Sequence, residues 1–193
     1  MAATPSTMLD LGTPLPPFQL KDFNGATVSS ADLAGAKGVL VMFVSVHCPF
    51  VKLIQEEVGR FGADYGPKGI KMVAIGANDL ATHPLDGPEG MKGQAAANGW
   101  SFPYLVDETQ AVAKAFKAAC TPDIFLFDGT GTLAYRGQFD GARPGYGVAV
   151  TGADLRAAAD QVVAGKPVSA EQRPSIGCNI KWRSGNEPDY FQA

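Results

Sequence analysis

The sequence predicts an α/β domain built on a mixed β-sheet. Residues 39–46 form an unbroken apolar run typical of a central strand covered on both faces, and residues 70–75 form a second one. The segment 49–65 between them is helical in character and ends at Gly-Pro-Lys-Gly, so we expect the two strands to pair in parallel through a right-handed crossover. A third apolar run, 124–127, leads through Asp-Gly-Thr-Gly into residues 133–139, which predicts an antiparallel edge.

Turn residues bound the remaining elements. Asn24-Gly25 between two short apolar segments indicates an N-terminal hairpin. Pro88 opens a helix after a loop, 78–90, that is rich in proline, glycine and acidic residues, and loops that follow parallel strands tend to border active sites. The other expected elements are a strand at 104–106 and helices at 109–118 and 151–163.

No internal repeat or linker divides the chain, so we expect residues 1–193 to form one domain. A chain of this length can bury a full core without disulfide bonds. Residues 1–17, rich in proline and threonine, are predicted to be an irregular lead-in. Residues 166–193 are predicted to be a nonperiodic C-terminal tail whose scattered apolar side chains pack on the body.

Composition and charge narrow the choice of partners and of compartment. The chain has 16 basic and 19 acidic residues, and the basic ones are scattered, so neither nucleic acid nor a membrane surface is an expected partner. Its apolar runs are far shorter than the roughly 18 residues of a membrane span, and its N-terminus lacks the features of a signal peptide. Three widely spaced cysteines are too few for a secreted disulfide scaffold, which favours a reducing, cytoplasmic location.

Cys48 is the leading candidate for chemistry. It follows the apolar run 39–46 and precedes Pro49 and Phe50, which begin the predicted helix. A thiol at a helix N-terminus faces free backbone N–H groups and the positive end of the helix dipole, and both favour the thiolate. We therefore expect a nucleophilic sulfur at this position, the alternative being a small apolar core residue.

Two basic residues flank this thiol. His47 either donates charge or a hydrogen bond to the thiolate or points away, since adjacent residues at a strand end face opposite sides. Lys52, one helical turn beyond Cys48, either stabilises an anion there or extends into solvent. Only His83 accompanies His47, without the spacing of a metal site, so we expect neither a metal nor another cofactor.

Two segments of the chain resemble parts of a known redox site. A strand, Cys48-Pro49 at a helix start and then Lys52 resemble the redox motif of thioredoxins. Cys120-Thr121-Pro122 resembles the segment that carries a cis-proline beside the redox cysteine. With these segments the chain resembles the peroxiredoxin-like branch of the thioredoxin superfamily, often labelled the alkyl hydroperoxide reductase/thiol-specific antioxidant family. The resemblance spans roughly residues 10–188 and implies a thioredoxin-like fold, a three-layer αβα arrangement around a central mixed sheet. The other segments that carry it are 102–108, 135–140 and 175–182.

The motif departs from both patterns that it resembles. Thioredoxins have a second cysteine where this chain has Val51, which is also where the peroxidatic cysteine of peroxiredoxins aligns. The peroxiredoxin motif Pro-x-x-x-Thr-x-x-Cys is not met, because Val41 and Ser45 occupy its first two defined places when they are counted back from Cys48. The resemblance therefore implies a thiol-disulfide oxidoreductase or thiol-dependent antioxidant protein more closely than a peroxiredoxin proper.

The resemblance also implies roles for the other thiols. Cys48 attacks a disulfide or a peroxide, and Cys120, Cys178 or an external thiol such as glutathione or thioredoxin resolves the product. A Cys48–Cys120 bond is expected before a Cys48–Cys178 bond, because a thioredoxin-like sheet brings the segment before the proline against the helix start. For Cys120 and for Cys178, the alternative to a resolving role is that the side chain only fills space in the core. The residues expected to bind substrate are His47, Pro49, Phe50, Lys52, Thr121 and Pro122.

A noncatalytic module is the alternative function. In this hypothesis the thioredoxin-like fold holds a peptide or small ligand in the groove beside the cis-proline. The missing second cysteine favours the module, and the cysteine retained at the helix start favours an enzyme. The rate of Cys48 alkylation against pH distinguishes the two, because a binding module should show ordinary thiol behaviour. The sequence specifies neither the substrate, the reductant nor the oligomeric state.

Overall fold

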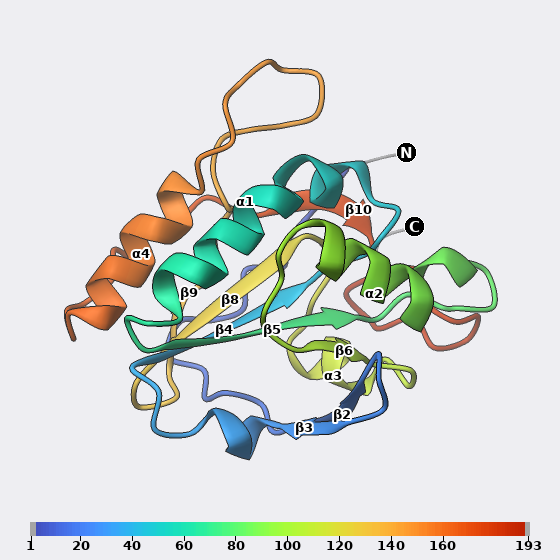
Figure 1. Cartoon of the computed structure of the whole chain (residues 1–193), viewed down its shortest axis with the longest axis horizontal. Coiled ribbons are helices and arrows are strands. Elements are labelled where there is room, and N and C mark those ends of the chain that lie inside the picture. Colours follow the sequence, from blue (N-terminus) through green and yellow to red (C-terminus); the bar gives the residue numbers. More distant parts are fainter. Residues whose placement is uncertain (1–2, 192–193) are drawn as a thin grey trace.

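A computed structural model describes residues 3–191 as two β-sheets with flanking helices (Figure 1). The helices are α1 (Pro49–Tyr65), α2 (Pro88–Ala97), α3 (Ala111–Ala115) and α4 (Ala153–Val163), with the short 3-10 helices η1 (Ser30–Leu33) and η2 (Pro84–Asp86). The strands are β1 (Ala3–Pro5), β2 (Gln19–Asp22), β3 (Thr27–Ser29), β4 (Gly38–Phe43), β5 (Ile70–Gly76), β6 (Tyr104–Val106), β7 (Cys120–Thr121), β8 (Asp123–Asp128), β9 (Leu133–Tyr135) and β10 (Ile176–Asn179).

The larger sheet is mixed, in the order β3-β2-β6-β5-β4-β8-β9. β4 pairs in parallel with β5 and β5 with β6, whereas the other pairs are antiparallel. The central place of β4 follows from its sequence, because every residue from Gly38 to Phe43 is buried and a fully apolar strand needs cover on both faces. The parallel crossover and the antiparallel edge predicted from the sequence are confirmed.

Alternation along β4 divides the core into two parts. Leu40 and Met42 pack toward α1, α2 and α4, whereas Val41 and Phe43 pack toward α3 and the N-terminal segment. Figure 1 shows the same division, with α1, α2 and α4 on the upper side of the larger sheet and α3 below it. The three-layer αβα arrangement around a mixed sheet is therefore confirmed.

Two segments expected to be irregular contain short strands. β1 lies in the predicted lead-in and β10 in the predicted tail, and the two pair antiparallel with each other. β10 also pairs with β7, which produces a second sheet in the order β1-β10-β7. Strands of three or four residues are too short to show a hydrophobic period, so their sequence alone does not reveal them.

Two other elements are shorter than the sequence predicts. The helix expected at 109–118 covers only Ala111–Ala115, because Gln110 and Lys117 on either side have left-handed φ angles of 62° and 49°. The strand expected at 133–139 ends at Tyr135, because the chain beyond it turns to the tail, where the Gln138 N–H donates to the Arg173 carbonyl at 2.8 Å.

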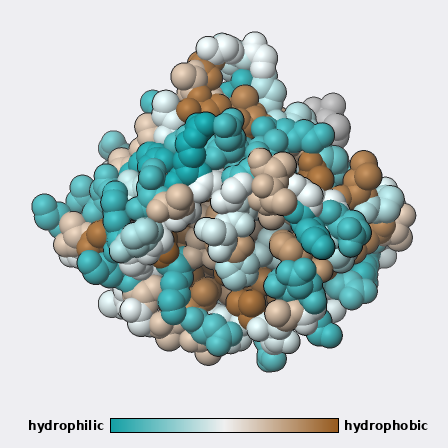
Figure 2. Space-filling view, viewed as in Figure 1, coloured by the Kyte–Doolittle hydropathy of each residue, from teal (hydrophilic) through white to brown (hydrophobic). Residues whose placement is uncertain are grey.

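The face of the molecule turned to the viewer in Figure 2 is mainly polar. Figure 2 shows a largely hydrophilic face on which apolar residues surface in separate patches. The exposed large apolar side chains include Tyr146 and Val148, which belong to the connection between β9 and α4. Within residues 3–191, no helix combines the length and the apolar character needed to cross a membrane.

Candidate functional site: a buried thiol cluster

Cys48 lies at the junction between β4 and α1. Its backbone is extended, with φ −66° and ψ 122°, and it is the N-cap residue of α1, whose first residue is Pro49. Proline is well placed there, because the N–H that it lacks has no partner in a first helical turn. Cys48 has no exposed surface, and Val51, at the place of a thioredoxin's second cysteine, is equally buried in the core.

The Cys48 thiol points at the backbone of Thr121. Its Sγ donates a hydrogen bond to the Thr121 carbonyl oxygen at 3.0 Å, and the Thr121–Pro122 peptide bond is cis. The Thr121 hydroxyl lies 3.4 Å from the hydroxyl of Ser45, which stands three residues before Cys48. The structure thus brings together the sequence-predicted residues Cys48, Thr121 and Pro122.

The second sulfur beside Cys48 is that of Cys178. Figure 1 places β10 beside the N-terminal end of α1. Cys178 pairs with Thr121 across β10 and β7, and it lies in the same buried cluster as Cys48. Burial, and then the proximity of Cys48, raises the pKa of Cys178 to about 12. Cys178 therefore keeps its proton at neutral pH.

Gly177 permits this close approach. A Cβ atom at this position would lie 1.9 Å from the Thr121 carbonyl oxygen, so only glycine fits between β10 and β7. The other edge of β10 is covered by β1, in which Ala3 stands opposite Cys178 and Thr4 opposite Gly177. Cys178 is therefore held on the middle strand of a sheet.

Cys120 is buried in the same region but is oriented differently. Its Sγ lies 3.5 Å from the Pro122 carbonyl oxygen, as the donor of a weak hydrogen bond within its own segment. Cys178 stands opposite Thr121 in the strand pairing, so the two side chains lie on the same face of the small sheet. Cys120 precedes Thr121 in its strand, and its side chain therefore lies on the opposite face. The sequence favoured Cys120 as the first partner of Cys48, and the strand pairing sets Cys178 on the face opposite to that of Cys120. Burial, and then the charge of Asp123, raises the pKa of Cys120.

Asp123 follows the cis-proline and is completely buried. Its Oδ2 accepts the Ala119 N–H at 3.0 Å, but its Oδ1 has no hydrogen-bond partner among the described residues. Burial raises the pKa of Asp123 to about 6, against an ordinary value of 3.8. The folded protein therefore binds a proton here at a pH at which the unfolded chain has released it. The stabilisation from this proton is complete below pH 3.8 and is lost as the pH rises through about 6.

Asp123→Asn is expected to remove this pH dependence. The free energy of unfolding of the natural protein should fall between pH 4 and pH 7 more steeply than that of the variant, by on the order of 3 kcal/mol, because only the natural side chain can ionise. Urea unfolding at several pH values measures the difference. Asp10→Asn, at an exposed carboxylate, is the matched control and should keep the natural slope. Equal slopes for Asp123→Asn and the natural protein would contradict the prediction.

His47 is turned toward an acidic residue that the sequence analysis did not single out. Its Nδ1 donates to the Asp86 Oδ2 at 2.6 Å, and its ring stacks on that of His83 with centroids 4.9 Å apart. Burial, and then the charge of His47, lowers the pKa of His83. Asp86 is buried and lies in the loop after β5. The expectation that this loop borders an active site is the feature of the sequence that could have identified Asp86 as a site residue.

The remaining predicted binding residues lie near the surface. Lys52 is exposed, and its backbone N–H donates to the Cys48 carbonyl at 2.9 Å as part of the helix. Pro49 is exposed too, whereas Phe50 is half-buried. Phe50 and Pro122 line a small cavity of about 20 Å³.

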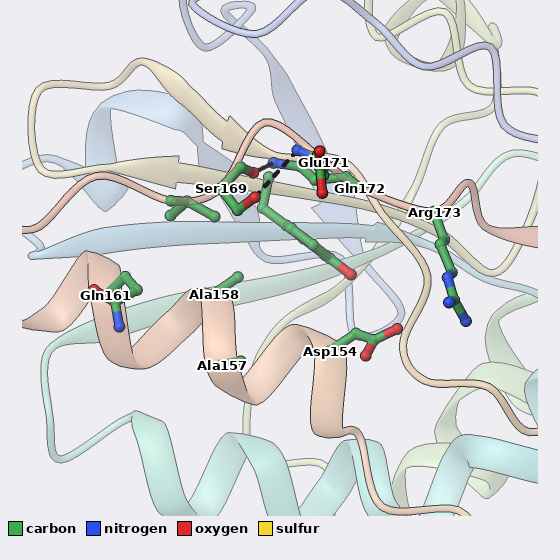
Figure 3. A pocket seen from close by; sticks show the side chains of 10 residues that line it. Asp154, Ala157, Ala158, Gln161, Ser169, Glu171, Gln172 and Arg173 are labelled. Atoms are coloured by element: carbon green, nitrogen blue, oxygen red, sulfur yellow. Dashed lines mark hydrogen bonds between the residues drawn. The ribbon is translucent and has the colours of Figure 1, made fainter.

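A larger hollow lies away from the thiols. This groove, of about 460 Å³, lies between α4 and the segment 168–173, with Asp154 and Arg173 toward one end (Figure 3). It contains none of the residues that the sequence predicted for the site. Among the described residues, no three histidine, cysteine or acidic side chains are grouped as metal ligands would be.

A cysteine that starts the first long helix and faces the residue before a cis-proline, on this mixed sheet, defines a protein of the thioredoxin-like class. The sequence profile of the AhpC/TSA family matches residues 11–136. The chain belongs to the AhpC/TSA family. A search of curated proteins gave no match.

Solved structures share this fold. An uncharacterized conserved protein from Geobacillus kaustophilus is 48% identical, with a TM-score of 0.92 over 95% of this chain and 97% of that one. A hypothetical protein from Sinorhizobium meliloti 1021 is 49% identical, with a TM-score of 0.92 over 94% of this chain and 100% of that one. A putative thioredoxin from Neisseria meningitidis is 26% identical, with a TM-score of 0.59 over 79% of this chain and 91% of that one.

Proposed function

We propose that the protein is a thiol-disulfide oxidoreductase in which Cys48 is the nucleophile and Cys178 is the second redox sulfur. The observation that carries this proposal is the position of Cys178 opposite Thr121, whose carbonyl oxygen accepts the Cys48 thiol at 3.0 Å at the start of α1. A thioredoxin-like fold, membership of the AhpC/TSA family and the similarity to a putative thioredoxin support a redox role. A reducing cytoplasm would keep such a pair in its dithiol form.

The proposed reaction transfers two electrons to the substrate. The Cys48 thiolate attacks one sulfur of a substrate disulfide, forms a mixed disulfide and releases the first substrate thiolate, which takes up a proton. Cys178 loses its proton to water and attacks the Cys48 sulfur, which releases the second substrate thiolate and closes a Cys48–Cys178 bond. An external dithiol or two molecules of glutathione then restore both thiols by the same exchange.

A peroxide is the second candidate oxidant, in an antioxidant role. The Cys48 thiolate would take the outer oxygen of a hydroperoxide and release an alkoxide or hydroxide, which is protonated to an alcohol or water. Attack by Cys178 on the resulting sulfenic acid would release water and form the same Cys48–Cys178 bond. Both oxidants therefore lead to one protein product.

The position of Cys178 suits the resolving step. Its place opposite Thr121 sets Cys178 beside the carbonyl group that the Cys48 thiol contacts, and its pKa is raised, so we assign the first attack to Cys48 and the resolving step to Cys178. Both side chains are buried, so the substrate gains access only when the segments around them open locally.

Occupation of the edge beside the cis-proline argues against the binding-module alternative. An extended peptide would add to the backbone edge at Thr121, and in the described structure β10 already pairs there. Displacement of β10 would also break its pairing with β1. This favours the enzyme over a module that holds a peptide in that groove.

Oxidation followed by peptide mapping tests the proposal. The reduced protein is treated with glutathione disulfide or hydrogen peroxide, the remaining thiols are alkylated, and the peptides are identified by mass spectrometry. We expect a bond between Cys48 and Cys178, with Cys120 alkylated. Cys120→Ser is the matched control and should give the same bond. A bond between Cys48 and Cys120, or three unreacted thiols, would contradict the proposal.

A further inference from the structure

Asp86 holds the turn that presents Cys48. It is a buried residue, its side chain being only 3% exposed, and it comes from η2 rather than from β4 or α1. Its Oδ1 accepts the backbone N–H groups of Val46 at 2.7 Å and His47 at 3.2 Å. Its Oδ2 accepts His47 Nδ1 at 2.6 Å and Asn78 Nδ2 at 2.8 Å. One carboxylate therefore binds the two residues immediately before Cys48.

Asn78 extends this contact to the segment that carries Cys178. Its Nδ2 donates to Asp86, and its Oδ1 accepts the backbone N–H of Lys181 at 2.8 Å. Asp79 and Gln110 also bind the backbone of Lys181. The Asp79 N–H donates to the Lys181 carbonyl oxygen at 2.8 Å, and Gln110 Nε2 donates to the same oxygen at 2.9 Å. A continuous chain of hydrogen bonds thus runs from the backbone before Cys48 to the backbone after Cys178.

The two sulfurs come from distant parts of the chain, so their proximity depends on contacts of this kind. A disulfide forms only when the two Cα atoms lie within about 7 Å, and small shifts of either backbone strain it. Among the described residues, the N–H groups of Val46 and His47 donate to Asp86 and to no backbone carbonyl. Loss of the acceptor would leave these partly buried donors unpaired, and the turn would have to rearrange.

We propose that Asp86 and Asn78 are positioning residues that hold Cys48 and Cys178 in register for disulfide formation. This inference rests on the proposed function. Neither residue exchanges electrons with the substrate; both act through the backbone that carries the sulfurs. They raise the effective concentration of one thiol at the other. This effective concentration is measured as the equilibrium constant of the reaction in which the dithiol protein and glutathione disulfide give the internal disulfide and two molecules of glutathione.

Redox titration of variants in glutathione buffers tests the inference. The natural protein, Asn78→Ala, Asp86→Asn and the double variant are equilibrated, alkylated and quantified for the Cys48–Cys178 bond by mass spectrometry. We expect each single variant to lower the equilibrium constant at least tenfold. The double variant should lower it by little more than the stronger single one, because both residues belong to one chain of contacts.

A control separates positioning from general stability. Tyr135→Phe removes a buried hydrogen bond, from the Tyr135 hydroxyl to the Gln138 carbonyl at 2.5 Å, that does not belong to this chain of contacts. Urea unfolding ranks the stability of the variants, and Tyr135→Phe should keep the natural equilibrium constant. If Asp86→Asn does not fold, Asn78→Ala decides the result.

Two outcomes would overturn the inference, and they are distinguishable. A natural protein that forms no Cys48–Cys178 bond in any buffer overturns the proposed function and the positioning role with it. A natural protein that forms the bond, while Asn78→Ala and any folded Asp86→Asn keep its equilibrium constant, overturns the positioning role alone.

Discussion

Cys48→Ser is expected to abolish reduction of a small disulfide by the reduced protein, by at least about a hundredfold in rate, while the fold is retained. A serine hydroxyl stays protonated at neutral pH and is a poor nucleophile toward sulfur, whereas a cysteine thiolate is a strong one. The serine Oγ can still donate to the Thr121 carbonyl, as the natural Sγ does at 3.0 Å. Consumption of glutathione disulfide measures the activity, and urea unfolding measures the stability.

Cys120→Ser is the matched control for this prediction. Cys120 is as buried as Cys48, but its Sγ bonds within its own segment, so its loss should change the rate by no more than about twofold. Full activity in Cys48→Ser would assign the reaction to another thiol. Equal losses in both variants would point to a general effect of disturbing the thiol cluster.

Cys178→Ser is expected to stop the reaction halfway. Cys48 should still attack glutathione disulfide, but no neighbouring sulfur would then displace the bound glutathione, so one glutathione should remain attached to Cys48. Release of the second thiol should slow by about a hundredfold or more, because the resolving step then depends on an external thiol in place of one held in the same buried cluster. Intact-protein mass spectrometry measures the adduct, and peptide mapping assigns it to Cys48.

The natural protein is the reference in the same experiment. It should lose two hydrogens and carry no adduct, because Cys178 completes the exchange. Turnover by Cys178→Ser at the natural rate, without an accumulated adduct, would contradict this role. Cys120 or an external thiol would then be the resolving partner.

Local sequence signals were sufficient for the centre of the fold and for the leading thiol. The strand β4 is apolar at every position after Gly38, and the helix α1 begins at a proline, so both could be predicted without knowledge of their neighbours. Cys48 stands between these two elements, and its place at a helix start follows from them. Each of these predictions depends on residues adjacent in the chain.

The contacts that complete the site depend on residues far apart in the chain. Neither β10 nor β1 has a hydrophobic period that would reveal it, and their pairing joins the two ends of the described chain. Which cysteine shares the side of Thr121 depends on the register that sets Cys178 opposite Thr121, and a shift of one residue would turn Cys178 to the other face.

The amino-acid sequence by itself determined the mixed sheet, the helix that starts at Pro49 and the cysteine before it, because hydrophobic period and turn chemistry are local properties. Only the tertiary structure decided that Cys178 stands opposite Thr121, whose carbonyl accepts the Cys48 thiol, and that Asp86 and Asn78 join the two segments. Strand register and buried side-chain hydrogen bonds are set by packing between distant segments, and no local pattern encodes them.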